Sequence, residues 1–426
     1  MVRLPYGARE LQVRIPEGRF RLVEPEGSGA PEPPLEAFRR ALTEPVGSPL
    51  LEELTAGRNV CYLFDDATRS EPHGEFLRAV LERLVKASGV RGIVATGSHE
   101  RLSAGNKRIV ERFRAIAGEV GLSYSVGIHD CEDPSRHVQL GVTSRGTPVE
   151  VSREVLDADV IVVTSDVKNH YFAGYSNALK EVLPGVSSFA AIEHNHSFAL
   201  DARSTFGRHP WHPDPARRTN PVAEDMLEAF EMVTAGKDVF VLAAVTTTKG
   251  ALWAGAGSAR DVTREAIRHV DSADSVRVAP ARYLIVSPGG NPEDETLYNA
   301  QRGLELSRYG VREGGEVLFI ASCDRGVAPT AGARAEFYDR LTAPLDEVLA
   351  GLQAKYVLYS HKAYKFAQFI KSVRSIHMLT DLSAAEVEAA HMTKVENAQA
   401  VVDGWLRESD EPILISTLAN KVALYP

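Results

Sequence analysis

The chain has 426 residues, of which 44% are hydrophobic and 25% are charged, a composition typical of globular proteins. This length is too great for one ordinary domain and predicts two or three. The net charge of -9 argues against a nucleic acid as partner, because such binding needs a cationic surface. The three cysteines, Cys61, Cys131 and Cys323, are widely spaced, which favours a reducing compartment without a disulfide framework.

The N-terminal segment lacks the apolar core of a signal peptide. No apolar run approaches the roughly 18 residues that a membrane span requires. We therefore expect a cytoplasmic protein that does not bind a membrane.

Short apolar runs alternate with amphipathic stretches along the chain, a pattern typical of βα units. The first half predicts strands at 59–64, 92–97, 159–164 and 239–245, with helices at 74–87 and 107–118. The second half predicts strands at 283–287, 317–321, 356–358, 375–379 and 412–416, with a helix at 293–307. The expected fold class is α/β, with mainly parallel sheets flanked by helices.

A domain boundary is expected within residues 272–281, just before a new series of strands. We predict an N-terminal domain of residues 1–275, joined by a returning last segment at about 410–426. Residues 276–409 would form a smaller C-terminal α/β domain.

Polar side chains follow several of these strands, where ligands of open α/β sheets bind. Asp66, Thr68 and Arg69 come after the first strand and before a helix, whose N-terminus suits a phosphate. The same residues could simply cap that helix. His99 follows the second strand and could transfer a proton, or it could be an ordinary loop histidine.

The third strand leads into a segment rich in aromatic and small residues that ends at Lys180. A lysine in apolar surroundings loses hydration, so its amine becomes more nucleophilic. His194 and His196 follow, and imidazole is a common ligand for nickel, copper and zinc. A helix-surface lysine and two polar loop histidines remain the simpler alternatives.

Together these segments resemble the lactate racemase family over most of the chain, most specifically within residues 170–185. The resemblance implies a nickel-pincer nucleotide, Ni(II)-pyridinium-3,5-bisthiocarboxylate mononucleotide, covalently tethered to Lys180. It implies that His196 binds the nickel and that His99 and His170 are the catalytic acid/base residues.

The resemblance also assigns residues to the nucleotide and to the substrate. Asp66, Thr68 and Arg69 match the segment that holds the nucleotide. Arg69, Tyr298, Asn299 and Arg302 are the residues expected to bind substrate. The N-terminal domain would then bind the cofactor and perform catalysis, and the C-terminal domain would close over the substrate in a cleft between the two.

The implied activity is that of an isomerase, a racemase or epimerase that inverts C2 of a 2-hydroxy acid. Moving the hydrogen as hydride avoids a carbanion at a weakly acidic carbon, and a base on each side of the substrate permits inversion. The expected partners are the small 2-hydroxy acid and the proteins that synthesise the cofactor.

Some positions depart from the lactate racemase pattern. Asn299 and Arg302 replace a Gln and Lys pair, and residues 360–364 stand where a Trp-Gln pair is expected. Polar donors in place of an indole would suit a larger, polyhydroxylated sugar acid better than lactate.

Two other functions are compatible with parts of the pattern. His194 and His196 on one strand could serve a divalent-metal hydrolase, because alternate strand residues share a face. A non-catalytic nickel- or nucleotide-binding protein would keep Lys180 and His196 without needing the two acid/base histidines.

Overall fold

The computed structural model describes residues 1–23, 29–69 and 71–426. The chain forms two compact units: Ser28–Asp271, here called the central unit, and Met1–Gly27 with Ser272–Pro426, here called the terminal unit. Among the described residues, no helix has the length and apolar character needed to cross a bilayer.

The central unit is built on a six-stranded sheet with the order β13-β12-β9-β4-β5-β6. Its strands are β4 Asn59–Asp65, β5 Gly89–Ala95, β6 Tyr124–Ile128, β9 Val160–Asp166, β12 Asp238–Thr247 and β13 Gly250–Gly257. All neighbouring pairs are parallel except β12 and β13. Every residue of β9 is buried, as expected for a central strand covered on both faces.

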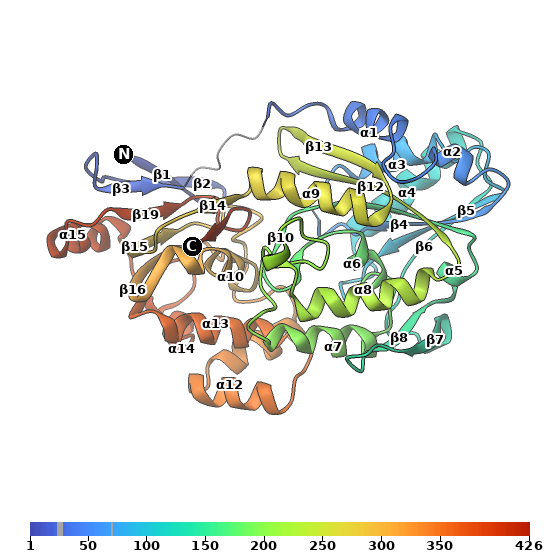
Figure 1. Cartoon of the computed structure of the whole chain (residues 1–426). Coiled ribbons are helices and arrows are strands. Elements are labelled where there is room, and N and C mark those ends of the chain that lie inside the picture. The colour runs from blue at the N-terminus through green and yellow to red at the C-terminus, as the bar shows by residue number, and fades with distance from the viewer. Residues whose placement is uncertain (24–28, 70) are drawn as a thin grey trace. The chain divides into compact units, whose positions relative to one another are not determined.

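Among the helices of the central unit (Figure 1), α1 packs on β12 and β13 and α4 packs on β5 and β6. The helices of this unit are α1 Pro34–Thr43, α2 Leu51–Leu54, α3 His73–Leu81, α4 Ala104–Glu119, α5 Arg153–Leu156, α6 Ala178–Val182, α7 Phe189–Ser197, α8 Pro221–Thr234 and α9 Ala259–Ala273. The alternate β4 residues Val60, Tyr62 and Phe64 share one apolar core with α1, α3 and α4. Helix α6 contacts β4 and β9, and α8 contacts both α6 and α7.

Two short ribbons complete the central unit. One pairs β7 His137–Val142 with β8 Pro148–Ser152, and the other pairs β10 Asn169–His170 with β11 Gly174–Tyr175. The second ribbon follows β9 directly and carries part of the segment rich in aromatic and small residues.

The terminal unit contains a second six-stranded sheet, with the order β18-β17-β16-β15-β19-β3 and every pair parallel. Its strands are β3 Phe20–Leu22, β15 Ala281–Val286, β16 Val311–Ile320, β17 Ser375–Leu379, β18 Thr393–Lys394 and β19 Ile413–Ser416. Two smaller pairs are β1 Val2–Tyr6 with β2 Arg9–Val13, and β14 Ser275–Arg277 with β20 Ala423–Tyr425. The helices are α10 Leu297–Leu306, α11 Ala331–Ala333, α12 Leu345–Ala354, α13 His361–Ser372, α14 Ala384–Ala389 and α15 Ala398–Glu408.

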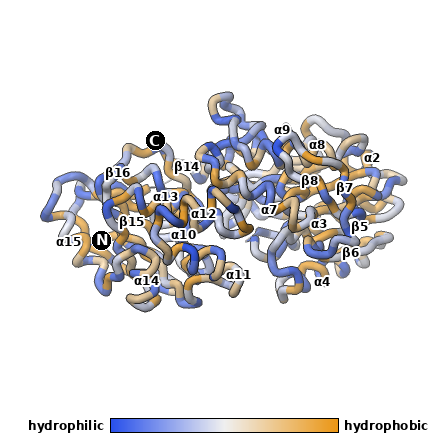
Figure 2. The backbone as a smooth tube through the Cα atoms, turned by 90° about the horizontal axis from the view of Figure 1, so that it is seen from below, coloured by the Kyte–Doolittle hydropathy of each residue, from blue (hydrophilic) through white to orange (hydrophobic). Residues whose placement is uncertain are grey.

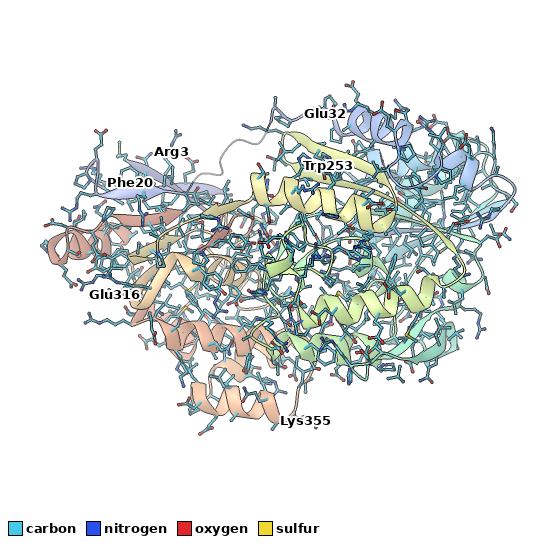
Figure 3. All side chains as sticks on the ribbon, viewed as in Figure 1. Arg3, Phe20, Glu32, Trp253, Glu316 and Lys355 are labelled. Atoms are coloured by element: carbon cyan, nitrogen blue, oxygen red, sulfur yellow. The ribbon has the colours of Figure 1, made fainter. Side chains whose placement is uncertain are left out.

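The core of the terminal unit joins the β1–β2 hairpin, the sheet and α15. Tyr283 of β15 stacks on Trp405 of α15 with ring centroids 4.7 Å apart. The Trp405 indole nitrogen donates to the carboxylate of Glu316, which Figure 3 labels on β16. In Figure 2, which colours the backbone by hydropathy, the apolar runs of strands such as β15 appear orange. The α/β class with mainly parallel, helix-flanked sheets is therefore confirmed.

Three expectations from the sequence are wrong. Residues 410–426 do not join the central unit, because β19 lies between β15 and β3 in the sheet of the terminal unit. Residues 1–23 belong to that same unit, since β3 pairs with β19. Residues 356–358 form no strand: Tyr359 adopts a positive φ of 76° and the chain turns into α13.

Candidate active site

The candidate site lies at the carboxyl edge of the central sheet. Strands β9, β4 and β5 are adjacent and parallel, so their last residues meet at one edge. The loops that leave this edge begin at Asp66, Thr96 and Val167. The three polar segments predicted from the sequence therefore follow neighbouring strands, as ligand-binding loops of open α/β sheets do.

Asp66 and His99 form a hydrogen-bonded pair across two of these loops. The Nδ1 of His99 lies 2.8 Å from Oδ2 of Asp66. The other oxygen of Asp66 accepts from the backbone and hydroxyl of Thr68, at 3.0 and 2.5 Å. Burial acts to raise the pKa of Asp66, but the charge and hydrogen bond of His99 lower it below its usual value. The ionised carboxylate therefore fixes a proton on Nδ1 of His99 and leaves Nε2 as the atom that exchanges protons.

His170 has the opposite hydrogen-bonding arrangement. Its Nδ1 accepts the backbone N–H of Ala173 at 3.2 Å, so the neutral ring carries its proton on Nε2. The ring stacks on Tyr171 and meets the edge of Phe172, with centroids 5.3 and 4.5 Å apart. One histidine is thus set as a proton acceptor at Nε2 and the other as a donor.

Gly174 shapes the ribbon that carries His170. In β10–β11, His170 is directly opposite Gly174, whose φ is +81°. A side chain on Gly174 would meet the backbone oxygen of Arg208 at 1.7 Å. Only glycine fits there, because it tolerates positive φ and has no Cβ. The next residue, Tyr175, donates its hydroxyl to Asp271 at 2.5 Å.

Lys180 and His196 lie in the same part of the central unit. Lys180 is only 7% exposed on α6. His196 on α7 contacts Phe172, with ring centroids 5.1 Å apart, so Phe172 touches both His170 and His196. Burial, and then the charges of Lys180 and His99, lower the pKa of His196 to about 3. The imidazole is therefore neutral, the form that can bind a metal, and it lies within electrostatic reach of both residues.

Arg69 is surrounded by carboxyl groups that the sequence analysis did not single out. Its Nε lies 3.8 Å from Asp65. Burial acts to lower the pKa of Arg69, but the charges of Asp65, Asp66, Glu181 and Glu71 raise it above its usual value. Burial, and then the charge of Glu71, raise the pKa of Asp65 to about 8. Burial, and then the charges of Asp65 and Glu71, likewise raise the pKa of Glu181. Part of this acidic cluster therefore stays protonated at neutral pH, which leaves positive charge on Arg69 available for an anion. The acidic residues that lie close to Arg69 in the sequence could have indicated this cluster.

The remaining predicted residues lie on α10 of the terminal unit. Tyr298 and Arg302 are one turn apart and share a face of this helix. The backbone N–H of Asn299 is capped by the hydroxyl of Thr296 at 3.3 Å. Lys362, which the sequence analysis did not assign, places its Nζ 3.7 Å from the centre of the Tyr298 ring and donates to the Tyr298 carbonyl at 2.7 Å.

The structure does not support the His-x-His pair that a divalent-metal hydrolase would need. His194 and His196 lie on helix α7, not on a strand, and residues two apart on a helix point in different directions. His194 instead contacts the Thr147 hydroxyl at 2.9 Å. Within the part of the chain that the structure describes, no three His, Cys, Asp or Glu side chains are grouped to hold a metal ion.

Comparison with known proteins gives consistent matches. The family model described as the lactate racemase N-terminal domain matches residues 6–207. The lactate racemase of Thermoanaerobacterium thermosaccharolyticum is 25% identical over 334 residues, covering 76% of this chain and 75% of that protein. The lactate racemase of Lactiplantibacillus plantarum is 25% identical over 297 residues, covering 68% of this chain and 66% of that protein.

Solved structures share the fold. The lactate racemase apoprotein from T. thermosaccharolyticum superposes with a TM-score of 0.87 at 21% identity, covering all of both chains. A protein from Thermotoga maritima superposes with a TM-score of 0.65 at 15% identity, covering 93% of this chain and all of that one. Residues 6–207 thus match the N-terminal domain model of the lactate racemase family, and the chain is similar to two named lactate racemases over more than two thirds of its length.

Proposed function

We propose that this protein is a racemase or epimerase that inverts C2 of a 2-hydroxy acid, using a nickel-pincer nucleotide tethered to Lys180. The main support is the gathering of His99, His170, Lys180 and His196 in one unit. Phe172 touches two of the histidines, and the pKa of His196 is lowered by Lys180 and His99. The named relatives are lactate racemases, which supports the same class of reaction.

The residues present suit the proposed cofactor. Lys180 is buried, so its amine loses hydration and becomes a better nucleophile for a covalent tether. His196 is neutral and offers the nitrogen that Ni(II) accepts. Thr68 and Arg69, before the first turn of α3, are candidates for the nucleotide phosphate. When bound, the nickel-pincer nucleotide would supply a reversible acceptor for the C2 hydride.

The two histidines provide the proton steps. The Nε2 of His99 would take the hydroxyl proton, and the charge that His99 gains would be balanced by Asp66 at 2.8 Å. The Nε2 of His170 would return a proton when the 2-keto acid is reduced on its other face. Inversion needs one acceptor and one donor, and the hydrogen bonds of these rings set them in those two states.

The substrate contacts we propose are those of Arg69 in the central unit and of Tyr298, Asn299 and Arg302 in the terminal unit. A guanidinium can bind the substrate carboxylate in a bidentate manner. The polar residues 360–364 and the ammonium of Lys362 favour a larger, polyhydroxylated sugar acid over lactate. We further propose that the protein acts in the cytoplasm, where cofactor-synthesis proteins load it.

The test is turnover by enzyme produced together with the cofactor-synthesis proteins. Lactate, longer aliphatic 2-hydroxy acids and aldonates, each deuterated at C2, are followed by chiral chromatography and mass spectrometry. Hydride return predicts an inverted product that keeps its deuterium. Loss of deuterium to solvent would contradict the hydride route.

Variants distinguish a catalytic racemase from a non-catalytic nucleotide carrier. Lys180→Ala should lose the nucleotide adduct in intact-mass spectra, whereas Lys237→Ala, which alters another lysine of the central unit, should retain it. His99→Ala and His170→Ala should keep the adduct and lose turnover. An adduct on Lys180 combined with no inversion of any acid would instead indicate a non-catalytic nucleotide carrier.

A further inference from the structure

Asp225 is a buried carboxyl group that the proposed chemistry does not use. It lies on α8 and is 0% exposed. One oxygen accepts the hydroxyl of Thr143 at 2.6 Å, and the other accepts the hydroxyl of Thr147 at 2.7 Å and the amide of Asn195 at 2.8 Å. In the described residues no Lys, Arg or His forms an ion pair with it. These three hydrogen bonds offset the cost of burying the group and fix its orientation.

The contact with Asp225 decides how the Asn195 side chain is turned. Asn195 is fully buried, and its amide nitrogen donates to both Asp225 and the Val222 carbonyl, at 2.8 and 3.2 Å. Both amide protons are therefore used, and the amide oxygen must point the other way. That oxygen lies 3.2 Å from Nδ1 of His196.

The orientation of Asn195 in turn favours one tautomer of His196, whose ring also makes a hydrogen bond with the backbone of Ile192. An amide oxygen can only accept a hydrogen bond, so Nδ1 of His196 must carry the proton and Nε2 keeps its lone pair. A flipped Asn195 would present its NH₂ group to Nδ1 and favour the tautomer protonated on Nε2. That second tautomer has no lone pair on Nε2 to give to a metal.

We propose that Asp225 is a positioning residue that acts through Asn195 to hold His196 in the Nδ1–H tautomer. This inference rests on the proposed function only in taking nickel as the ligand of His196. Asp225 on α8 also joins α7, through Asn195, to the turn between β7 and β8, through Thr143 and Thr147. Helices α7 and α8 lie side by side in Figure 1. A purely structural role would lower stability without altering the tautomer, so the tautomer distinguishes the two roles.

The experiment measures the His196 tautomer in the full-length apoprotein. Protein labelled with ¹⁵N-histidine is studied by two-bond ¹H–¹⁵N correlation, and His196→Gln assigns the signal. Wild type should show a protonated Nδ1 and an unprotonated Nε2. Asp225→Leu, which removes the acceptor of the Asn195 amide, and Asn195→Ala should shift His196 toward the other tautomer. Thr143→Val, which removes a hydrogen bond from the far oxygen of Asp225, is the matched control and should leave the tautomer unchanged.

Two results would overturn the proposal. One is a wild-type His196 already protonated on Nε2, a result that needs no variant to fold. The other is a tautomer unaffected by Asp225→Leu, or shifted equally by Thr143→Val. In the loaded enzyme, Asp225→Leu should lower turnover about 10- to 100-fold. If no cofactor binds Lys180 at all, the proposed function fails while the tautomer result in the apoprotein still stands.

Discussion

Replacing Gly174 by alanine should destabilise the central unit severely, for a reason that the structure makes quantitative. The new methyl group would lie 1.7 Å from the Arg208 carbonyl oxygen, whereas real Cβ atoms stay beyond 3.0 Å. The backbone must therefore move by more than an ångström. The positive φ of +81° costs an alanine about 1–2 kcal/mol, and overpacking adds about 1–3 kcal/mol. We expect a loss of about 2–5 kcal/mol.

Gly236→Ala is the matched control. Gly236 has nearly the same φ, +75°, but no atom lies within 4 Å of the added methyl group. It should lose only about 1–2 kcal/mol. At about 2–4 °C per kcal/mol, thermal unfolding of the apoprotein should fall by about 10 °C for Gly174→Ala and about 4 °C for Gly236→Ala. Equal losses in the two variants would refute the argument that contact with Arg208 makes the difference.

Three further predictions concern carboxyl groups of the central unit. Asp66→Asn should lower kcat at least about 10²-fold in the loaded enzyme, because His99 loses the group that fixes its Nδ1 proton; wild-type kcat would contradict this. The raised pKa of Asp65 means that the folded state holds a proton that the unfolded state releases, so apoprotein stability should fall between about pH 4 and pH 8. Asp65→Asn should reduce this fall of the thermal unfolding temperature with pH. An unchanged pH dependence would contradict the raised pKa of Asp65. Burial acts to raise the pKa of Asp271, but hydrogen bonds and the charge of Arg217 lower it below its usual value. The ionised Asp271 therefore adds to the free energy of unfolding above about pH 4, and this stabilisation is lost in acid. Asp271→Asn should cost about 2–3 kcal/mol near neutral pH and little near pH 2, as measured by urea unfolding.

The sequence alone determined the local elements and the residue types of the candidate site. The apolar runs that became β4, β5 and β9 were predicted, because a strand buried on both faces needs an unbroken series of apolar residues. The polar residues that follow them were also predictable, since a parallel sheet brings its strand ends to one edge. Lys180 and His196 were singled out by residue type and by the family resemblance.

Only the tertiary structure decided which distant segments meet. Strand β19 lies in the terminal sheet because it pairs with β15 and with the three-residue β3, and no local pattern reveals a hydrogen-bonding partner far along the chain. The same holds for polar pairs. The 2.8 Å contact of Asp66 with His99 and the contact of Asp225 with Asn195 each join segments at least thirty residues apart. Hydrophobic periodicity records which face of an element is buried, whereas partners and proton positions depend on hydrogen bonds that form only when the chain is folded.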